Sequence, residues 1–284
     1  MIMSLQEAQI QEATKFSGLS HHHQMNFHHI GDVECEKKFV FKELNERNEF
    51  IQMFALRYLV YRYVNFIEPN EDQLDIDCYD LYATFLGAFE VTGKTRRLVG
   101  TIRIISGDEI SRYAGVVKDI IENLDNQKAS DLMNRTKLFP IMDTFDIPES
   151  YFHAFSSDNH KPKEENGNPF ELSRLAVLPE YWGTKTRIEF GLHELIILDS
   201  WKSNPKKNIY LIATHPRTRR KYNKIGFQII PGTKEKLYKS LKQLAIAMSV
   251  NLDNYLKNPN PYTARCKSLY NSFLEKGYFE KGDI

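Results

Sequence analysis

The sequence predicts a mixed α/β (α+β) fold with a central mixed sheet, helices on both of its faces and a C-terminal helical extension. First, short β-rich segments alternate with segments in which apolar residues recur at helical spacing. Second, their order is strand–helix–strand–strand, a long insert, then strand–helix–strand–helix–strand, which is typical of a mixed sheet covered by helices. Third, 42% of the 284 residues are hydrophobic and 26% are charged, as in a globular protein with a substantial core.

The elements before the insert are predicted in chain order as follows. Residues 38–42 alternate around apolar side chains and are predicted to form a strand. Residues 43–65 follow as a helix, because aromatic and aliphatic residues recur at three- and four-residue intervals. Residues 82–91 and 98–105 are β-rich, and the segment Thr92-Gly93-Lys94-Thr95 between them predicts a hairpin turn.

The elements after the insert continue the same alternation. Residues 170–177 are apolar at alternate positions and are predicted to form a strand. Residues 184–200 have one apolar face and are predicted to form a helix. A strand at 208–214, a helix at 217–225 and a strand at 227–231 complete the predicted order.

Two segments lie outside this regular pattern. The insert, residues 106–168, is irregular and rich in proline, with one helix predicted at 116–124. An insert of this length in a compact domain is typical of a functional loop or of disorder. Residues 233–256 and 263–276 are predicted to be two helices, which make up the helical extension of residues 232–284.

The chain is accordingly divided into a flexible His-rich leader, residues 1–36, a compact domain, residues 37–231, and the extension. The leader contains the run His21-His22-His23-Gln24-Met25-Asn26-Phe27-His28-His29. Its imidazoles are suited to a transition metal, but no carboxylate or cysteine stands at a fixed spacing. A flexible solvated segment and a metal-binding segment therefore both remain open interpretations.

The bulk properties exclude several classes of function. A formal net charge of +1 provides no global field that would recruit nucleic acid or an anionic membrane. No apolar run approaches the ~20 residues that span a bilayer, and the polar N-terminus does not resemble a signal peptide. Three widely spaced cysteines predict reduced thiols rather than a disulfide framework. We therefore expect a cytoplasmic protein without a transmembrane segment.

A group of acidic residues precedes the first strand of the hairpin. Asp75, Asp77 and Asp80 lie within six residues, and such carboxylates repel one another unless cations or donors meet them. A solvated loop explains them as well as a paired cluster does. Cys78 lies among these acids, which raise rather than lower the pKa of a thiol, so it is a poor nucleophile.

Three arginines favour the paired interpretation. Arg57, Arg103 and Arg174 each stand among apolar residues on a predicted helix or strand, and an arginine is rarely buried without a carboxylate. The three aspartates and Glu171 nearly balance their charge. The sequence therefore predicts an ion-pair network that joins the first helix, the acidic loop and two strands.

The order of these residues resembles a known signature, that of the acyl-homoserine-lactone synthases. The matching positions are Arg57…Tyr61…Phe66…Asp75-x-Asp77-x-x-Asp80…Arg103…Glu171-x-x-Arg174. Asp75 stands where that family usually has Glu, and Phe66 where it usually has Trp. The segment Glu171-Leu172-Ser173-Arg174-Leu175-Ala176-Val177 is more similar to the bacterial N-acyl amino acid synthases, and exosortase-associated acyltransferases are similar there too. The resemblance covers residues 38–231 and implies a GNAT-like acyltransferase fold.

The resemblance also implies roles for these residues. Arg57, Asp75, Asp77, Asp80 and Arg103 would form a network that shapes the acceptor site. In the same way, Glu171 and Arg174 would be the catalytic pair, with Glu171 accepting a proton from the attacking amine. Burial raises the pKa of such a carboxyl and a neighbouring arginine lowers it, and the sequence does not decide between them. A purely structural Glu171–Arg174 ion pair is the alternative.

The resemblance places the acyl donor between a strand and the following helix. There it implies a pantetheine-binding segment with Val177, Trp182, Gly183, Thr184 and Lys185. In GNAT folds, backbone N–H groups at this helix N-terminus hold a pyrophosphate. Only one glycine of the usual pattern remains, which favours the phosphopantetheine arm of an acyl carrier protein over CoA.

The expected function is transfer of a long-chain acyl group from an acyl carrier protein (or acyl-CoA) thioester to the α-amine of an amino acid. No metal and no bound cofactor are required; the acyl donor is a co-substrate. Basic residues at 217–221 suit an acidic carrier protein, or simply form a solvated helix face. The alternatives are an acyl-homoserine-lactone synthase using S-adenosylmethionine, a non-catalytic acyl-carrier or lipid-binding module, and a generic acetyltransferase.

Overall fold

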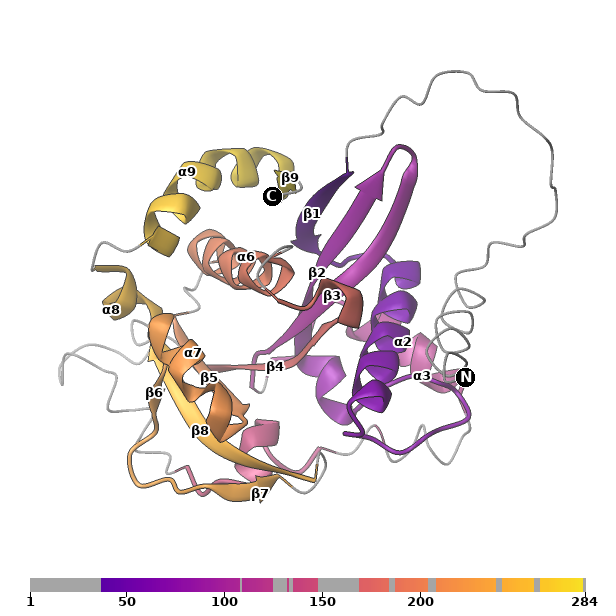
Figure 1. Ribbon diagram of the computed structural model, residues 1–284. Helices are drawn as coiled ribbons and strands as arrows, with labels where there is room; N and C mark the ends of the chain where they lie inside the picture. Colours follow the sequence, from indigo (N-terminus) through magenta and orange to yellow (C-terminus); the bar gives the residue numbers. More distant parts are fainter. Residues whose placement is uncertain are drawn as a thin grey trace, which may run out of the picture. The chain divides into compact units, whose positions relative to one another are not determined.

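A computed structural model describes most of the chain beyond the leader (Figure 1). The described residues are 37–107, 109–124, 132, 135–147, 169–183, 187–203, 208–238, 242–257 and 261–282. The chain divides into two units, Met1–Cys35 and Glu36–Ile284, and the description concerns the second unit. The predicted His-rich leader, residues 1–36, and much of the insert lie outside the described residues.

Within the described residues, one nine-stranded mixed sheet forms the centre of the fold. The strands are β1 (Lys37–Glu43), β2 (Ala83–Thr92), β3 (Thr95–Ile105), β4 (Pro169–Val177), β5 (Ile209–Thr214), β6 (Gln228–Ile229), β7 (Lys236–Tyr238), β8 (Gln243–Asn251) and β9 (Tyr278–Gly282). Their order is β6-β8-β5-β4-β3-β2-β1-β9, with β7 pairing with β8. Only β4 and β5 pair in parallel, so the predicted mixed sheet is confirmed.

Except for α8 (Leu252–Lys257), the described helices follow the predicted positions with shifted ends. They are α2 (Arg47–Tyr63), α3 (Ala114–Glu122), α6 (Ile188–Lys202), α7 (Arg219–Lys224), α8 (Leu252–Lys257) and α9 (Pro261–Lys276). The 3₁₀ turns are η1 (Cys78–Tyr82), η2 (Pro140–Asp143), η4 (Pro179–Tyr181) and η5 (Pro216–Thr218). Among the described residues, no helix has the length and apolarity that crossing a membrane requires.

Helices cover both faces of the sheet, as predicted. On one face Phe50 and Phe54 of α2 meet the ring of Phe85 in β2. On the other face Gly191 of α6 lies against the ring of Phe41 in β1, and any Cβ at this glycine would collide with that ring. In Figure 1, α2 and α6 accordingly lie on opposite sides of β2 and β3. Alternation along each strand therefore decides which helix a side chain meets.

The helix predicted over residues 233–256 is wrong. This segment forms β7, β8 and the short helix α8, and β8 lies inside the sheet between β5 and β6. Its apolar run from Ala245 to Val250 is buried throughout. Periodicity does not separate such a run from a buried helix, and pairing with β5 overrides the helical propensity of its Ala, Leu and Met residues.

The end of the chain is partly as predicted. The helix predicted at 263–276 is confirmed as α9, but the chain then returns as β9 and pairs with the edge strand β1. This pairing covers backbone groups that an edge strand leaves exposed. The segment predicted as a helical extension therefore contributes strands at two places in the central sheet.

Candidate active site

Arg57 is a fully buried member of the predicted ion-pair network. It lies on the sheet-facing side of α2 with a side chain that is 0% exposed. Its Nε donates to Asp75 Oδ2 at 2.8 Å, and Nη1 and Nη2 donate to the two carboxylate oxygens of Asp80 at 2.8 and 3.3 Å. Such a bidentate pair satisfies both charges in a low-dielectric interior.

Arg103 joins the same carboxylates from β3. Its Nη1 donates to Asp77 Oδ1 at 2.5 Å and to Asp80 Oδ1 at 2.7 Å, and its Nε donates to Ser173 Oγ at 3.0 Å. The strand places it on the face covered by α2, opposite Phe85 in the register. The network therefore connects α2, η1, β3 and β4 on one face of the sheet.

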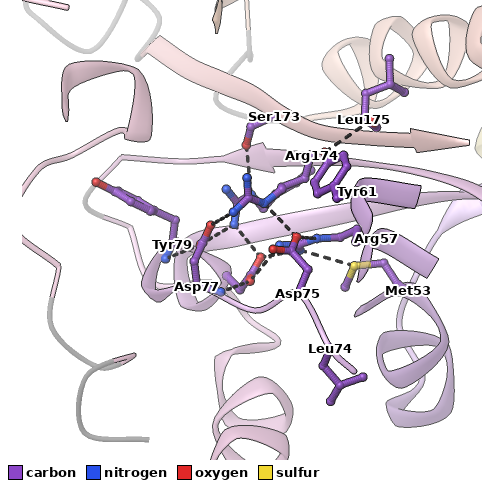
Figure 2. Close-up of polar contacts among 12 residues, drawn as sticks. Met53, Arg57, Tyr61, Leu74, Asp75, Asp77, Tyr79, Ser173, Arg174 and Leu175 are labelled. Atoms are coloured by element: carbon purple, nitrogen blue, oxygen red, sulfur yellow. Dashed lines mark hydrogen bonds and ion pairs between the residues drawn. The ribbon is translucent and has the colours of Figure 1, made fainter. Parts of the chain in front are cut away.

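Arg174 completes the network from a bulge in β4. Residues 174 and 175 both stand opposite Ile102, and Arg174 has φ of 54°, in the left-handed region. Its Nη2 donates to Asp77 Oδ2 at 3.0 Å. Its Nε lies 2.9 Å from Asp75 Oδ2, close enough for an ion pair but without hydrogen-bond alignment. Figure 2 shows these side chains converging on Asp75 and Asp77.

The acidic residues are positioned by their own local structure. Asp77 Oδ1 accepts from the Tyr79 amide at 3.0 Å, and Asp80 Oδ2 accepts from the Asp77 amide at 2.8 Å. This reciprocal capping fixes the first turn of η1. Burial alone would raise the pKa of Asp77, but Arg103 and Arg174 together hold it well below its usual range. Asp77 is therefore ionised, and the ion pairs of the predicted network are assembled.

Glu171 lies on the same face of β4 but outside these ion pairs. Its side chain is buried, and its Oε2 accepts from the Ile141 amide of η2 at 2.9 Å. Among the described residues, Arg174 pairs with Asp75 and Asp77, and no ion pair joins it to Glu171. Burial raises the pKa of Glu171 to about 8, against the smaller lowering effects of the Ile141 amide and Arg103. Desolvation thus outweighs the arginines.

The sheet opens directly beside Glu171. Strands β4 and β5 pair at three positions, the last being Glu171 opposite Leu211, and no further pairing joins them beyond it. Tyr61 of α2 lies on one face of this opening, with its hydroxyl 3.5 Å from the Leu175 carbonyl oxygen. Tyr222 of α7 lies on the other face, and its pKa is raised by burial and further by Glu189 and Tyr61. The two tyrosines are therefore close enough across the sheet for Tyr61 to affect the pKa of Tyr222.

An apolar cavity of about 30 Å³ lies on the α6 face, next to the opening. It is lined by Leu172, His193, Ile196, Ile197, Tyr210, Ile225, Phe227, Val250, Leu252, Tyr255 and Tyr262. Burial lowers the pKa of His193 to about 4, so the imidazole is neutral at pH 7. The lining suits an apolar chain rather than a charged group.

The residues expected to hold the acyl donor are partly described. Val177 ends β4, and its carbonyl oxygen accepts from Trp182 Nε1 at 2.6 Å. The indole is 49% exposed and lies edge-on to Tyr63, with 5.6 Å between ring centroids. Gly183 has φ of 101°, a conformation that explains the glycine. Thr184 and Lys185 lie outside the described residues.

Several groups of the site were missed by the sequence analysis. The Ile141 amide and Asp143 come from the irregular insert, which offers no periodic pattern. Tyr238 of β7 is close enough to the site that its pKa is affected, after burial, first by Glu171. It belongs to the segment predicted as a helix, so the error in the fold concealed it. Cys78 was expected to be a poor nucleophile, and burial and the charge of Asp77 do raise the pKa of its thiol to about 11.

Comparisons with known proteins support the fold. The family model described as an acetyltransferase (GNAT) domain matches residues 56–138, which include Arg57, the three aspartates and Arg103. A comparison with curated protein sequences gives no match. Among solved structures, FeeM, an N-acyl amino acid synthase from uncultured soil microbes, is similar at 15% identity and a TM-score of 0.51, covering 80% of this chain and 97% of that chain.

Two acyl-homoserine-lactone synthases are more distant. LasI is 13% identical over 76% of this chain and 91% of that chain, with a TM-score of 0.43. BjaI, a CoA-dependent enzyme solved with S-adenosylmethionine and isopentyl-CoA, is 14% identical over 81% of this chain and 99% of that chain, with a TM-score of 0.44. The domain model matched over residues 56–138 and the likeness to FeeM show that this chain has the GNAT fold.

Proposed function

We propose that this protein transfers a long-chain acyl group from an acyl carrier protein thioester, or from acyl-CoA, to the α-amine of an amino acid. The observation that carries the proposal is Glu171, a buried carboxyl with a pKa raised to about 8 at the point where β4 and β5 separate. A base is most effective when its pKa is near the working pH. The acetyltransferase domain match and the fold of an N-acyl amino acid synthase support the reaction class.

The network supports an amino acid as the acceptor. Of its three arginines, Arg57 and Arg103 have side chains that are 0% and 1% exposed, whereas that of Arg174 is 16% exposed. The partner of Arg174, Asp77, is 24% exposed. An accessible Arg–Asp pair matches an α-carboxylate and an α-ammonium group, the two charges of a free amino acid. The buried arginines hold the aspartates in place.

The reaction needs no covalent enzyme intermediate. Glu171, in its ionised form, takes a proton from the acceptor ammonium or attacking amine, and the neutral nitrogen forms a C–N bond with the thioester carbonyl. The C–S bond then breaks, and the leaving thiolate takes up the proton that the attacking nitrogen loses on becoming the amide, which gives the thiol. In this proposal Trp182, which is exposed beside Val177, contacts the pantetheine arm, and the apolar cavity lined by Leu172 receives part of the acyl chain.

Lipid extracts of expressing cells test the proposal. Mass spectrometry of cells that make the wild type should find a fatty amide of a defined amino acid, and Glu171→Gln should abolish it. Glu122→Gln removes an exposed carboxylate of α3 and should leave the amide unchanged. A lactone product would support a homoserine-lactone synthase instead. No product from cells or from purified protein with acyl carrier, acyl-CoA and amino acids would contradict the proposal.

A further inference from the structure

The base is covered by a part of the insert to which the sequence assigned no role. The segment 139–147 contains η2 and is anchored by Phe139, Ile141 and Phe145, each at most 1% exposed. It supplies the amide of Ile141 to Glu171 at 2.9 Å. We call this segment the η2 cover.

The η2 cover is connected to the ion-pair network by a side-chain hydrogen bond. The hydroxyl of Tyr79 in η1 donates to Asp143 Oδ2 in η2 at 3.0 Å. Burial and the charge of Asp143 raise the pKa of Tyr79, so the phenol stays a neutral donor. η1 is itself fixed by Asp77 and Asp80, which pair with the buried arginines. The network therefore provides a rigid base from which Tyr79 holds the cover.

We propose that Tyr79 and Asp143 are positioning residues for Glu171: their hydrogen bond holds the η2 cover so that it keeps water from the carboxyl and directs the Ile141 amide at it. This inference rests on the proposed role of Glu171 as the base. It also assigns a function to the insert that interrupts the acyltransferase domain, namely to set the environment of the base.

The charged and titratable groups around Glu171 explain why the cover matters. Besides Tyr79 of η1, they are Asp77 at the N-cap of η1, Arg103 of β3, Arg174 of β4 and Tyr238 of β7. The two arginines are paired with aspartates, so their effect on Glu171 is largely offset. The two largest influences on its pKa are burial and the Ile141 hydrogen bond. The η2 cover contributes to both.

Loss of the hydrogen bond between Tyr79 and Asp143 has two opposed effects on the pKa of Glu171. Water that reaches the carboxyl stabilises its ionised form and lowers its pKa, whereas loss of the Ile141 donor raises it. Burial is the larger of the two influences, so the net change should be downward from about 8. A misplaced carboxylate with a lower pKa is also a weaker base, so the maximal rate should fall.

The test measures the pH dependence of kcat/KM in the full-length chain. Tyr79→Phe and Asp143→Ala should both lower the midpoint by about one pH unit, because the carboxyl gains solvent. Asp143→Asn keeps an oxygen that accepts from Tyr79 and should retain a profile close to the wild type. Tyr270→Phe is the matched control, since it removes a hydroxyl that donates to the Trp201 carbonyl oxygen at 3.1 Å, on the α6 side of the sheet.

Amide hydrogen exchange at Ile141 provides a readout that does not depend on catalysis. Exchange should be at least about ten-fold faster in Tyr79→Phe and Asp143→Ala than in the wild type, and unchanged in Tyr270→Phe. An unchanged or raised pH midpoint together with unchanged exchange would overturn the proposal that Tyr79 and Asp143 hold the η2 cover. If Glu171→Gln keeps wild-type turnover, the base assignment fails, and the exchange data alone still decide whether Tyr79 holds the cover.

Discussion

Arg174 combines an unfavourable backbone conformation with two ion pairs. A non-glycine residue with φ of 54° costs on the order of 1 kcal/mol, and glycine would avoid that cost. The side chain reaches Asp75 and Asp77 from the bulge of β4, a position that a regular strand would not give it. The strain is therefore explained by what the guanidinium does at the site.

Replacing Arg174 by glycine separates these two contributions. Arg174→Gly relieves the backbone but leaves Asp75 and Asp77 without one cation, so the melting temperature should change by only a few degrees while KM for the amine acceptor rises about ten-fold or more. Lys242→Gly is the control, because Lys242 also has a left-handed φ but its side chain is 69% exposed. An acceptor KM that stays at the wild-type value in Arg174→Gly would contradict the assignment.

Glu171 should make the fold less stable as the pH rises. Its pKa is about 8 in the folded chain against an ordinary value of 4.5, so folding favours the protonated carboxyl. The destabilisation is absent at low pH, grows above the unfolded pKa and is complete above pH 8, where it is about 5 kcal/mol. Glu171→Gln should therefore melt well above the wild type at pH 9 and close to it at pH 5. An equal difference at both pH values would show that the carboxyl is not buried in a neutral form.

The ion-pair network could be predicted from sequence and the cover of the base could not. Three arginines stand in apolar segments: Arg57, Arg103 and Arg174. Because such segments become buried when the chain folds, their arginines need carboxylate partners. The contacts of Ile141 and Asp143 depend on how an irregular segment packs, and neither residue type indicates it. Local chemistry thus identified the charged partners but not the groups that set the pKa of Glu171.

Among the elements, β8 shows where sequence patterns fail. The segment Leu244-Ala245-Ile246-Ala247-Met248 suits a helix by propensity, and it becomes a strand because β5 and β6 lie on either side of it. The strands β1 to β5 were predictable because alternation or a short apolar run with turn residues marks each of them. The local sequence of a segment does not show which distant strands it pairs with.

Truncation distinguishes a sheet strand from a detachable extension. Deleting residues 232–284 removes β8 from the centre of the sheet, so the product should lack a cooperative thermal transition. Deleting residues 278–284 removes the edge strand β9 and the Lys281–Glu194 ion pair, and should lower the melting temperature but leave a folded chain. Thermal unfolding followed by circular dichroism measures both outcomes. A cooperative transition in the longer deletion would contradict the position of β8.

Over the whole molecule, positive and negative charges nearly balance, and the charged residues of the candidate site are concentrated in one ion-pair network. Its net charge is +1, and the three buried or half-buried arginines of the network are matched by three aspartates. The fold class followed from the order of elements, since a mixed sheet with helices on both faces accommodates that order. The positions of β8 and β9 did not, because they depend on which strand edges remain unpaired once the first five strands have assembled.

The pH dependence of kcat/KM for the wild type and Glu171→Gln, with an acyl carrier thioester and the amino acid acceptor, tests the central claim most directly. The account predicts a wild-type rate that rises with pH through a single ionisation at about 8, where Glu171 becomes a carboxylate. The variant should be slower by a factor of about 10² to 10⁴ and should lack that ionisation. A variant with the wild-type rate and the same midpoint would show that Glu171 is not the base.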